Sequence, residues 1–365
     1  MKAIILAGGY ATRLRPISYV IPKLLFPVVG KPMVHWTLDM LKKFGVNEVI
    51  LGVNYLADLL RAELGSTYDG MHVRYSLEKT PLGTAGPIKL ASHLTKLHGT
   101  FLAMNGDVIA DINIRRMLSH HLKTEASITD ALHEVMDPRR FGVVELDSAH
   151  RILRFVEKPN LNEAPSRLAN AGIYLIEPDV LRMIPDDRKF SLERQIFPGL
   201  ARQRRLSGFT FPGYWFDIGN LSDYQRANFE LLSRKAGKST LQEKRSKVSN
   251  RSALRPPVYV GRGSRIESGS SLGPFVLIGK SGQVGKRTRI TKSIIFDEVT
   301  IGEGSRVDGA VIASNVTIGK NVKIERGSTL SPYVQVGDGV RIGENAVVHP
   351  YKEVATNVSP GKHVM

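Results

Sequence analysis

The chain has 365 residues, which is enough for two domains that each bury their own core. It contains no cysteine, so disulfides and thiolate metal sites are excluded. No apolar run approaches the roughly 18 residues of a membrane span, so we expect a cytoplasmic protein with neither a span nor a signal peptide. The formal net charge of +17 comes from Lys and Arg spread through both halves, which favours a generally basic surface over nucleic-acid binding.

A Gly-rich turn follows the first predicted strand. Residues 2–6 have the apolar composition of a short buried strand, and residues 7–14 supply a turn whose backbone N–H groups can converge on an anion. Arg13 and Lys23 add permanent positive charges, and prolines stiffen the loop that holds them. The turn has neither the G-x-G-x-x-G spacing of a dinucleotide site nor the GK[ST] ending of a P-loop. A phosphate group is the expected ligand.

The segment from Leu6 to Lys23 resembles the opening of the nucleotide-sugar pyrophosphorylases, which join a sugar 1-phosphate to a nucleoside triphosphate. The family pattern is LAGGxGTRLRPLT followed by PKP, and this chain has LAGGYATRLRP followed by PK. Ala11 stands where the family usually has a flexible glycine, and a positive φ at that position would destabilise the turn. The resemblance implies that the nucleotide and its leaving group are bound by Leu6, Gly8, Gly9, Arg13 and Lys23.

Helical and strand patterns alternate in the next part of the chain. Residues 31–44 and 57–64 have apolar residues at helical spacing, whereas residues 48–53 and 72–77 are typical of buried strands. This alternation indicates βαβ units and therefore an α/β fold, a Rossmann-like domain with a mainly parallel, mixed sheet. Such sheets bind ligands in the loops at the carboxyl ends of their strands.

The loop at residues 78–87, EKTPLGTAGP, is the second informative stretch. Gly83 allows the backbone to approach a flat base, and Thr84 is a suitable cap for a helix that we expect to continue to about Leu97. The motif L-G-T-A-G-P looks like the nucleotide-base loop of the mannose-1-phosphate guanylyltransferase branch of the family. The ADP-glucose branch usually has G-T-A-D, and Gly86 in the last place disfavours it.

Two aspartates follow predicted strands. The strand at residues 100–104 leads into Asn-Gly-Asp, ending at Asp107, and the stretch 213–220, GYWFDIGN, contains Asp217. A pair of carboxylates can bridge Mg²⁺, a hard cation that prefers oxygen ligands, to a triphosphate. The same two motifs hold the metal aspartates in the family, so the resemblance implies that Asp107 and Asp217 are the Mg²⁺ ligands.

A third group of motifs suits a phosphorylated sugar. Glu157 can accept hydrogen bonds from sugar hydroxyls, and Lys158 can reach an anomeric phosphate as a compact charge. Together with Pro159 and the N-A-G-I-Y stretch that begins at Asn170, they look like the sugar-phosphate site of the family. Phe141-Gly142-Val143-Val144 matches its Y-G-V-V motif with Phe in place of Tyr, so only a backbone contact at Gly142 is expected to remain.

Two other features have plainer interpretations. His120 and His121 end a polar helix expected at residues 113–122, and we interpret them as solvated side chains rather than ligands. Residues 191–193, Ser-Leu-Glu, agree with the guanylyltransferase pattern, and we interpret them as mainly structural.

The composition changes near residue 240. Residues 241–257 are polar and basic, which we interpret as a linker after a catalytic domain at residues 1–240. An aliphatic residue then falls at every sixth position, with two shortened intervals, and this hexad predicts a left-handed parallel β-helix of roughly five coils over residues 258–348. An irregular tail is expected at 349–365. The hexad residues are Val260, Ile266, Leu272, Ile278, Val284, Ile290, Ile301, Val307, Ile318, Ile324, Leu330, Val336 and Ile342.

The repeat region has the pattern of some acyltransferases but not their general base. It contains no histidine before His349, which lies in the expected tail with His363. A role in assembly is therefore favoured, and stacked coils predict a homo-oligomer formed through the β-helix.

The resemblance implies an enzyme that transfers a nucleotidyl group to a sugar 1-phosphate and releases pyrophosphate. GTP and mannose 1-phosphate are the favoured substrates, and glucose 1-phosphate with UTP or dTTP is the alternative. A noncatalytic homologue that binds a nucleotide sugar and regulates a partner remains a further hypothesis, favoured by Ala11 and Phe141. The residues that oppose the noncatalytic hypothesis are Arg13, Lys23, Asp107, Lys158 and Asp217.

Overall fold

The computed structural model describes residues 1–54 and 56–365. The chain forms two compact units, one made of Met1–Tyr10 and Met33–Ile218 and the other of Ala11–Pro32 and Gly219–Met365. The predicted division after residue 240 therefore differs from the structure, because the loop after the first strand belongs to the second unit. None of the helices in the described residues is long and apolar enough to span a membrane.

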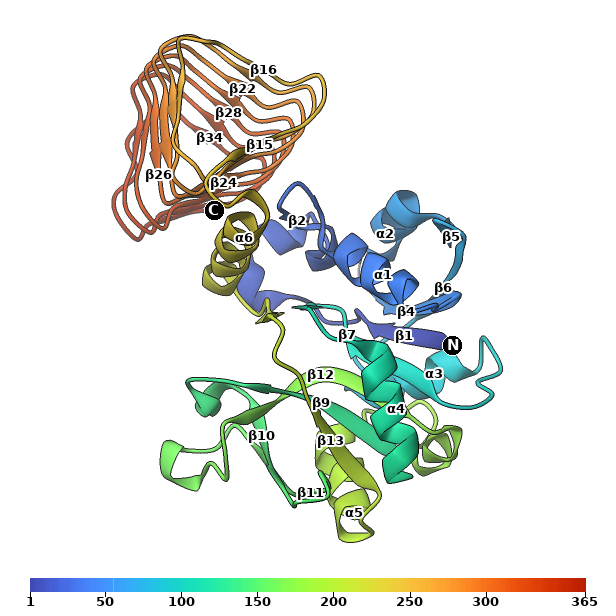
Figure 1. Cartoon of the computed structure of the whole chain (residues 1–365). Helices are drawn as coiled ribbons and strands as arrows, with labels where there is room; N and C mark the ends of the chain where they lie inside the picture. The colour runs from blue at the N-terminus through green and yellow to red at the C-terminus, as the bar shows by residue number, and fades with distance from the viewer. Residues whose placement is uncertain (55) are drawn as a thin grey trace. The chain divides into compact units, whose positions relative to one another are not determined.

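A ten-stranded mixed sheet forms the centre of the first unit (Figure 1). Its longest path runs in the order β11-β10-β12-β7-β1-β4-β6-β5, with β9 pairing to β12 and β13. The pairs β1–β4, β1–β7 and β4–β6 are parallel, whereas β12 is antiparallel to β7, so the Rossmann-like mixed sheet is confirmed. The strands are β1 (Lys2–Leu6), β4 (Glu48–Val53), β5 (Thr67–Tyr68), β6 (Met71–Leu77), β7 (Phe101–Asn105), β9 (Ile128–Glu134), β10 (Gly142–Leu146), β11 (Ile152–Glu157), β12 (Leu168–Ile176) and β13 (Leu206–Thr210).

Helices cover the sheet and bury its apolar side chains. Helix α3 packs against β1, β4 and β6, and helix α4 packs against β9, β12 and β13. The helices of this unit are α1 (Met33–Lys43), α2 (Ala57–Leu64), α3 (Gly86–Ser92), α4 (Ile114–Thr124) and α5 (Phe197–Arg202), with short turns η4 (Pro138–Arg140), η5 (Leu161–Glu163), η6 (Pro178–Met183) and η7 (Leu192–Ile196). Helix α3 ends five residues before the predicted Leu97.

The prediction that His121 is solvated is wrong. His121 is 1% exposed, its Nδ1 lies 2.7 Å from Thr129 Oγ1, and its Nε2 lies 3.0 Å from Glu177 Oε1. The two polar partners, Thr129 on β9 and Glu177 directly after β12, offset the loss of hydration. It is a core histidine with a structural role.

The second unit begins with a segment that leaves the first unit after β1. Residues 11–32 contain η1 (Thr12–Leu14), η2 (Ile17–Tyr19), η3 (Lys23–Leu25) and the hairpin of β2 (Pro27–Val28) and β3 (Lys31–Pro32). Phe26 packs edge-on against Tyr224 of α6 (Leu221–Ala236) and against Phe296, with ring centroids 5.6 and 5.7 Å apart. The Val29 N–H donates to Asn228 Oδ1 at 2.9 Å. These contacts explain why the segment belongs to this unit.

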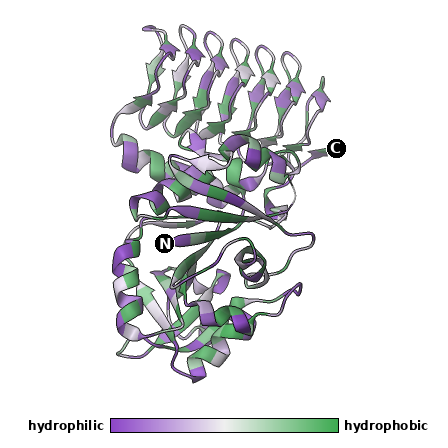
Figure 2. Ribbon diagram, turned by 90° about the vertical axis from the view of Figure 1, so that its right-hand side faces the viewer, coloured by the Kyte–Doolittle hydropathy of each residue, from purple (hydrophilic) through white to green (hydrophobic). Residues whose placement is uncertain are grey.

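Three all-parallel sheets, of eight, seven and six strands, form the rest of the second unit (Figures 1 and 2). This is the arrangement of the predicted left-handed β-helix. The first sheet comprises β15 (Thr240–Gln242), β18 (Val258–Val260), β21 (Val276–Ile278), β24 (Ser293–Ile295), β27 (Val311–Ile312), β30 (Thr329–Leu330), β33 (Val347–Val348) and β35 (His363–Val364). The second comprises β16 (Lys247–Val248), β19 (Arg265–Ile266), β22 (Gln283–Val284), β25 (Thr300–Ile301), β28 (Thr317–Ile318), β31 (Gln335–Val336) and β34 (Glu353–Val354). The third comprises β17 (Ala253–Leu254), β20 (Ser271–Leu272), β23 (Arg289–Thr291), β26 (Arg306–Asp308), β29 (Lys323–Ile324) and β32 (Arg341–Ile342).

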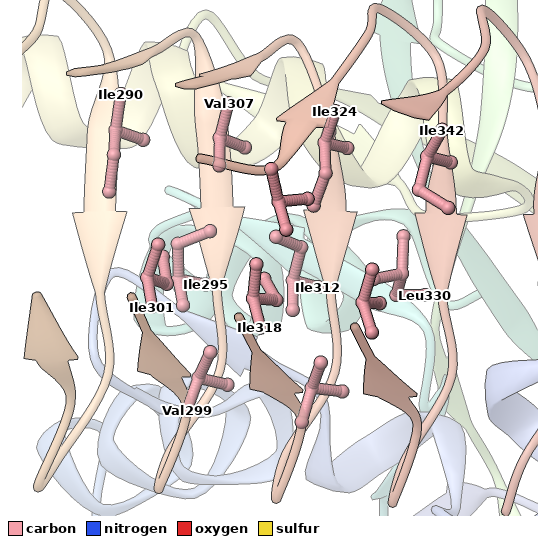
Figure 3. Packing of buried hydrophobic residues seen from close by; sticks show 14 of the residues in the cluster. Ile290, Ile295, Val299, Ile301, Val307, Ile312, Ile318, Ile324, Leu330 and Ile342 are labelled. Atoms are coloured by element: carbon pink, nitrogen blue, oxygen red, sulfur yellow. The ribbon is translucent and has the colours of Figure 1, made fainter. Parts of the chain in front are cut away.

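The aliphatic residues of the hexads fill the interior of the coils. Figure 3 shows that residues one coil apart stack on one another, as Ile290, Val307, Ile324 and Ile342 do along one sheet. All of the predicted hexad positions from Val260 to Ile342 are buried. Because each buried aliphatic side chain contributes about 1.5–3 kcal/mol, the repeat supplies most of the stability of this unit.

The predicted linker and tail are part of the β-helix, which corrects the domain boundaries. In residues 241–257, Leu241 pairs with Tyr259 and Leu254 pairs with Leu272, so these residues form the first coil. In the tail, β34 and β35 pair with the coils before them. Polar residues and two prolines hide the pattern at the start, although Val248 and Leu254 keep the six-residue spacing and pack against the interior.

Candidate active site

A cavity of about 350 Å³ opens at the carboxyl ends of β1, β6 and β7. This is the edge at which parallel sheets bind ligands, as the sequence predicts. Its lining comes from the turn after β1 and from the loops after β6 and β7. Six of the lining residues belong to the predicted site, namely Leu6, Gly8, Gly9, Gly83, Thr84 and Asp107.

The backbone of the first turn lies directly against a carboxylate. A Cβ atom on Gly8 would lie 2.0 Å from Glu78 Oε1, so a side chain at this position would require the Glu78 carboxyl group to move. A Cβ on Gly9 would meet no heavy atom within 4 Å in the part of the chain that the structure describes. Close packing against Glu78 therefore constrains Gly8 but not Gly9.

Glu78 is a cavity residue that the sequence analysis missed. It is 3% exposed, burial raises the pKa of its carboxyl group, and the Leu82 N–H donates to its Oε2 at 3.2 Å. Its Oε1 has no hydrogen-bond partner among residues 1–54 and 56–365. The position immediately after β6, at the ligand edge of the sheet, is the feature that would have identified it.

The base loop is held by backbone contacts and by a carboxylate. Gly83 has φ +81°, and a Cβ there would lie 2.5 Å from the Phe190 carbonyl oxygen, so the predicted glycine is required by the fold. The prediction that Thr84 caps the next helix is wrong, since no side chain caps α3. Its hydroxyl instead donates to Glu193 Oε2 at 2.6 Å, a charged acceptor that outcompetes a neutral cap.

The two predicted metal aspartates lie at one end of a pair of strands, Asp107 in the turn before the first strand and Asp217 at the end of the second. Asp217 ends β14 (Trp215–Asp217) and is opposite Val108 of the antiparallel β8 (Val108–Ala110). The Ile218 N–H donates to the Asp107 carbonyl at 3.0 Å. The described residues contain no group of three or more His, Cys, Asp or Glu side chains that could together hold a metal ion. A pair of carboxylates fits Mg²⁺, which keeps water and substrate phosphates in its remaining positions.

Gly142, Glu157 and Lys158 lie together on a second pair of strands. Gly142 of β10 is opposite Glu157 of β11, and a Cβ on Gly142 would lie 2.8 Å from Glu157 Oε2. Lys158 has a left-handed φ of 48°, its N–H donates to the Phe141 carbonyl at 3.0 Å, and its Nζ lies 3.7 Å from Glu157 Oε1. Glu157 and Lys158, two of the residues predicted for the sugar phosphate, therefore lie next to Gly142.

Trp215 connects the sugar motifs with the strand that ends in Asp217. Its ring packs edge-on against Phe141 with ring centroids 5.0 Å apart, and its Nε1–H donates to the Ala171 carbonyl at 3.0 Å. Phe141 precedes Gly142, and Ala171 follows Asn170. The structure therefore brings the predicted sugar residues and one of the predicted metal ligands to the same region of the first unit.

Arg13 and Lys23 lie in the second unit, on η1 and η3. Ala11 adopts the left-handed conformation (φ 47°, ψ 41°), so alanine occupies a backbone that glycine adopts at no cost. The carbonyl of Ala11 accepts from Leu14 N–H and Ser18 Oγ, each at 2.9 Å, which offsets the strain. A Cβ on Gly219 would lie 3.1 Å from Arg13 Nη1, so the glycine leaves room for the guanidinium.

A Rossmann-like sheet with a glycine turn, a cavity at its strand ends and two carboxylates beside it defines a nucleotide-dependent transferase. The chain belongs to the nucleotidyl transferase family, whose model matches residues 2–234. Residues 254–364 match the model of a GMPPB C-terminal domain. The family assignment agrees with the resemblance found in the motifs, and it makes the chain a sugar-1-phosphate nucleotidyltransferase.

Several curated relatives share most of their length with this chain. A putative mannose-1-phosphate guanyltransferase of Sulfolobus acidocaldarius is 35% identical over 74% of this chain and 74% of that protein. A mannose-1-phosphate guanylyltransferase of Mycobacterium tuberculosis is 32% identical over 82% of this chain and 81% of that protein. A mannose-1-phosphate guanylyltransferase catalytic subunit beta of Danio rerio is 41% identical over 61% of this chain and 62% of that protein.

Solved structures resemble the chain over 62–63% of its length. A putative glucose-1-phosphate thymidylyltransferase from Bacillus anthracis, in complex with a sucrose, is 29% identical with a TM-score of 0.56, and the match covers 62% of this chain and 94% of that one. HddC from Yersinia pseudotuberculosis, complexed with GMP-PN, is 27% identical with a TM-score of 0.54. The match covers 63% of this chain and 99% of that one.

Proposed function

We propose that the protein joins GTP to mannose 1-phosphate, forming GDP-mannose and pyrophosphate. The observation that supports a nucleotidyl transfer is the cavity at the strand ends, which contains the glycine turn, the base loop and Asp107. The choice of GTP and mannose 1-phosphate rests on relatives named mannose-1-phosphate guanylyltransferase, which span 74–82% of this chain at 32–35% identity.

The reaction requires alignment of two anions rather than a general base. A sugar 1-phosphate has a second pKa of about 6, so its oxygen is already a nucleophile near neutral pH. This oxygen attacks the α-phosphorus of GTP, and the bond to the leaving pyrophosphate breaks as the new one forms. Lys158 holds the attacking phosphate, Arg13 and Lys23 neutralise the leaving group, and the Gly8–Gly9 backbone binds the nucleotide.

The remaining residues position the metal, the base and the sugar. Asp107 and Asp217 would hold Mg²⁺, which supplies positive charge to the triphosphate when it is bound. Glu157, Asn170 and the Gly142 backbone contact the sugar.

Glu78 supports guanine as the base. Guanine presents two adjacent donors, N1–H and N2–H₂, which suit a buried carboxyl group with an unused acceptor oxygen. Uracil and thymine present one donor between two carbonyl oxygens, which would repel the same group. The unpartnered Glu78 Oε1, described above, lines the cavity beside the base loop.

A pyrophosphate-release assay over GTP, UTP, dTTP and ATP, each with mannose 1-phosphate or glucose 1-phosphate, tests the proposal. The highest kcat/KM is expected for GTP with mannose 1-phosphate. A higher value for glucose 1-phosphate with UTP or dTTP would favour the alternative enzyme. Binding of GDP-mannose without turnover of any pair would identify a regulatory homologue.

The protein is also proposed to form a homo-oligomer through the β-helix. Tyr333 and Tyr351, one coil apart, stack at 4.9 Å with an interplanar angle of 3° although they are 44% and 66% exposed. An exposed stacked aromatic pair is an unusual surface for a monomer. Light scattering after size exclusion is expected to give a multiple of 40.3 kDa, and a monomer at micromolar concentration would contradict this part of the proposal.

A further inference from the structure

Glu193 lies at the centre of a hydrogen-bond network inside the first unit. It belongs to the π-helical turn η7, directly before α5. Its Oε2 accepts hydrogen bonds from the hydroxyls of Thr84 and Ser191, both at 2.6 Å. Its Oε1 lies 3.1 Å from the Tyr174 hydroxyl. An ionised carboxylate only accepts hydrogen bonds, so three hydroxyl donors satisfy this one group.

On the nucleotide side, the direction of the hydrogen bonds is fixed. The Leu192 N–H donates to Thr84 Oγ1 at 2.9 Å, so the single hydroxyl proton of Thr84 points to Glu193. Thr84 lines the cavity in the loop proposed for the base. Glu193 therefore fixes the position of that loop through a charge-assisted bond.

On the sugar side, the same carboxylate reaches Asn170 through one tyrosine. Asn170 Nδ2 donates to the Tyr174 hydroxyl at 3.0 Å, and Asn170 Oδ1 accepts from Gly172 N–H at 2.7 Å. The Tyr174 hydroxyl lies 3.1 Å from both Asn170 Oδ1 and Glu193 Oε1, so the Asn170 amide and the Glu193 carboxylate share one hydroxyl group. Tyr174 is fully buried on β12, so water does not substitute for these partners.

A buried acid, Asp130 of β9, lies opposite Tyr174 of β12 and is 0% exposed. Burial, and to a lesser extent the charge of Glu193, raises the pKa of the Asp130 carboxyl well above its ordinary value. Glu193 is the carboxyl group with hydroxyl donors, whereas neither oxygen of Asp130 has a hydrogen-bond partner among residues 1–54 and 56–365.

We propose that Glu193 is a positioning residue that couples the two substrate sites, so that nucleotide bound at the Thr84 loop increases the affinity for the sugar phosphate at Asn170. The inference rests on the proposed function, which assigns Thr84 to the nucleotide and Asn170 to the sugar. The coupling path is Thr84–Glu193–Tyr174–Asn170, four side chains joined by direct hydrogen bonds.

Calorimetric titration tests the proposal on the full-length protein. Mannose 1-phosphate is titrated with and without a GTP analogue that cannot be cleaved between the α- and β-phosphates. In the unaltered protein the analogue is expected to tighten binding by a factor of about 5 or more. The coupling ratio is the dissociation constant of mannose 1-phosphate without the analogue divided by that with it. In Tyr174→Phe this ratio is expected to fall to about 1, whereas the affinity for the analogue alone should change less than about twofold.

Ser191→Ala is the matched control, because it removes a hydroxyl donor from the same Glu193 oxygen but lies outside the path to Asn170. It is expected to keep the ratio. Should Tyr174→Phe fold poorly in thermal melts, Glu193→Gln provides the same test, since its amide nitrogen cannot accept from a hydroxyl.

A ratio near 1 in the unaltered protein would overturn the inference, as would a full ratio in Tyr174→Phe or Glu193→Gln. Loss of the ratio in Ser191→Ala as well would show a general structural effect and would also overturn it. An unaltered protein that binds neither ligand refutes the proposed substrates instead, and the ratio is then measured with the pair that it turns over.

Discussion

Replacement of Asp130 by asparagine should change the pH dependence of stability. Asp130 is fully buried, and neither carboxylate oxygen has a hydrogen-bond partner within residues 1–54 and 56–365. Burial therefore raises the pKa of this carboxyl well above its ordinary value of 3.8. Asparagine has nearly the same shape and does not titrate.

The sign of the effect follows from proton binding in the two states. Below pH 3.8 Asp130 is protonated in both the folded and the unfolded chain, so its titration does not lower the free energy of unfolding there. Above that value the unfolded chain releases the proton and the folded chain keeps it. Stability is then lost by about 1.4 kcal/mol per pH unit until the pH reaches the raised pKa of the buried group.

Urea unfolding of both proteins at several pH values from about 4 upward measures this difference. The free energy of unfolding of Asp130→Asn, minus that of the unaltered protein, is expected to increase by about 1.4 kcal/mol for each pH unit in this range. Glu134→Gln, at an exposed carboxylate on the same strand, should show no such increase. Parallel pH profiles for Asp130→Asn and the unaltered protein would refute the assignment of a buried, protonated acid.

Three further substitutions test the site. Lys158→Ala should lower turnover at least about 100-fold without changing the melting temperature, because the side chain is 65% exposed; a near-normal rate would contradict its role. Gly142→Ala places a Cβ 2.3 Å from the Phe155 ring, so it should lower the free energy of unfolding by about 1–3 kcal/mol and raise the KM for the sugar phosphate. Gly199→Ala is the control and should do neither, because its Cβ meets no heavy atom within 4 Å among the described residues. Ala11→Gly removes left-handed strain but adds unfolded-state entropy, so the free energy of unfolding should change by less than about 1 kcal/mol; a larger loss would show that the alanine methyl is required.

The β-helix could be predicted from the sequence because its hexad depends on local spacing alone. Each inward position is aliphatic regardless of the rest of the fold, so the pattern is visible without tertiary contacts. The first coil was missed because it contains the two adjacent prolines and mostly polar residues, although Val248 and Leu254 keep the spacing. The predicted start of the β-helix at residue 258 therefore differs from the structure, because polar residues and prolines hide the six-residue spacing in the first coil.

The candidate site could be predicted where residues follow a strand or form a motif, and not where tertiary partners decide the role. Gly8, Gly83 and Asp107 were identified from their positions after strands, and all three line the cavity. Thr84 was interpreted as a helix cap because that is its local preference, but Glu193, 109 positions away, accepts its proton. His121 was expected in solvent for the same reason, since its partners lie on other elements.

The metal aspartates offer the most direct test of the proposed chemistry. Pyrophosphate release from GTP and mannose 1-phosphate in the presence of Mg²⁺ should be measured for the unaltered protein, Asp107→Asn and Asp217→Asn. We expect turnover by the unaltered protein with an equal yield of GDP-mannose, and a loss of at least about 100-fold in each variant. Release at near-normal rates from either variant would contradict the account.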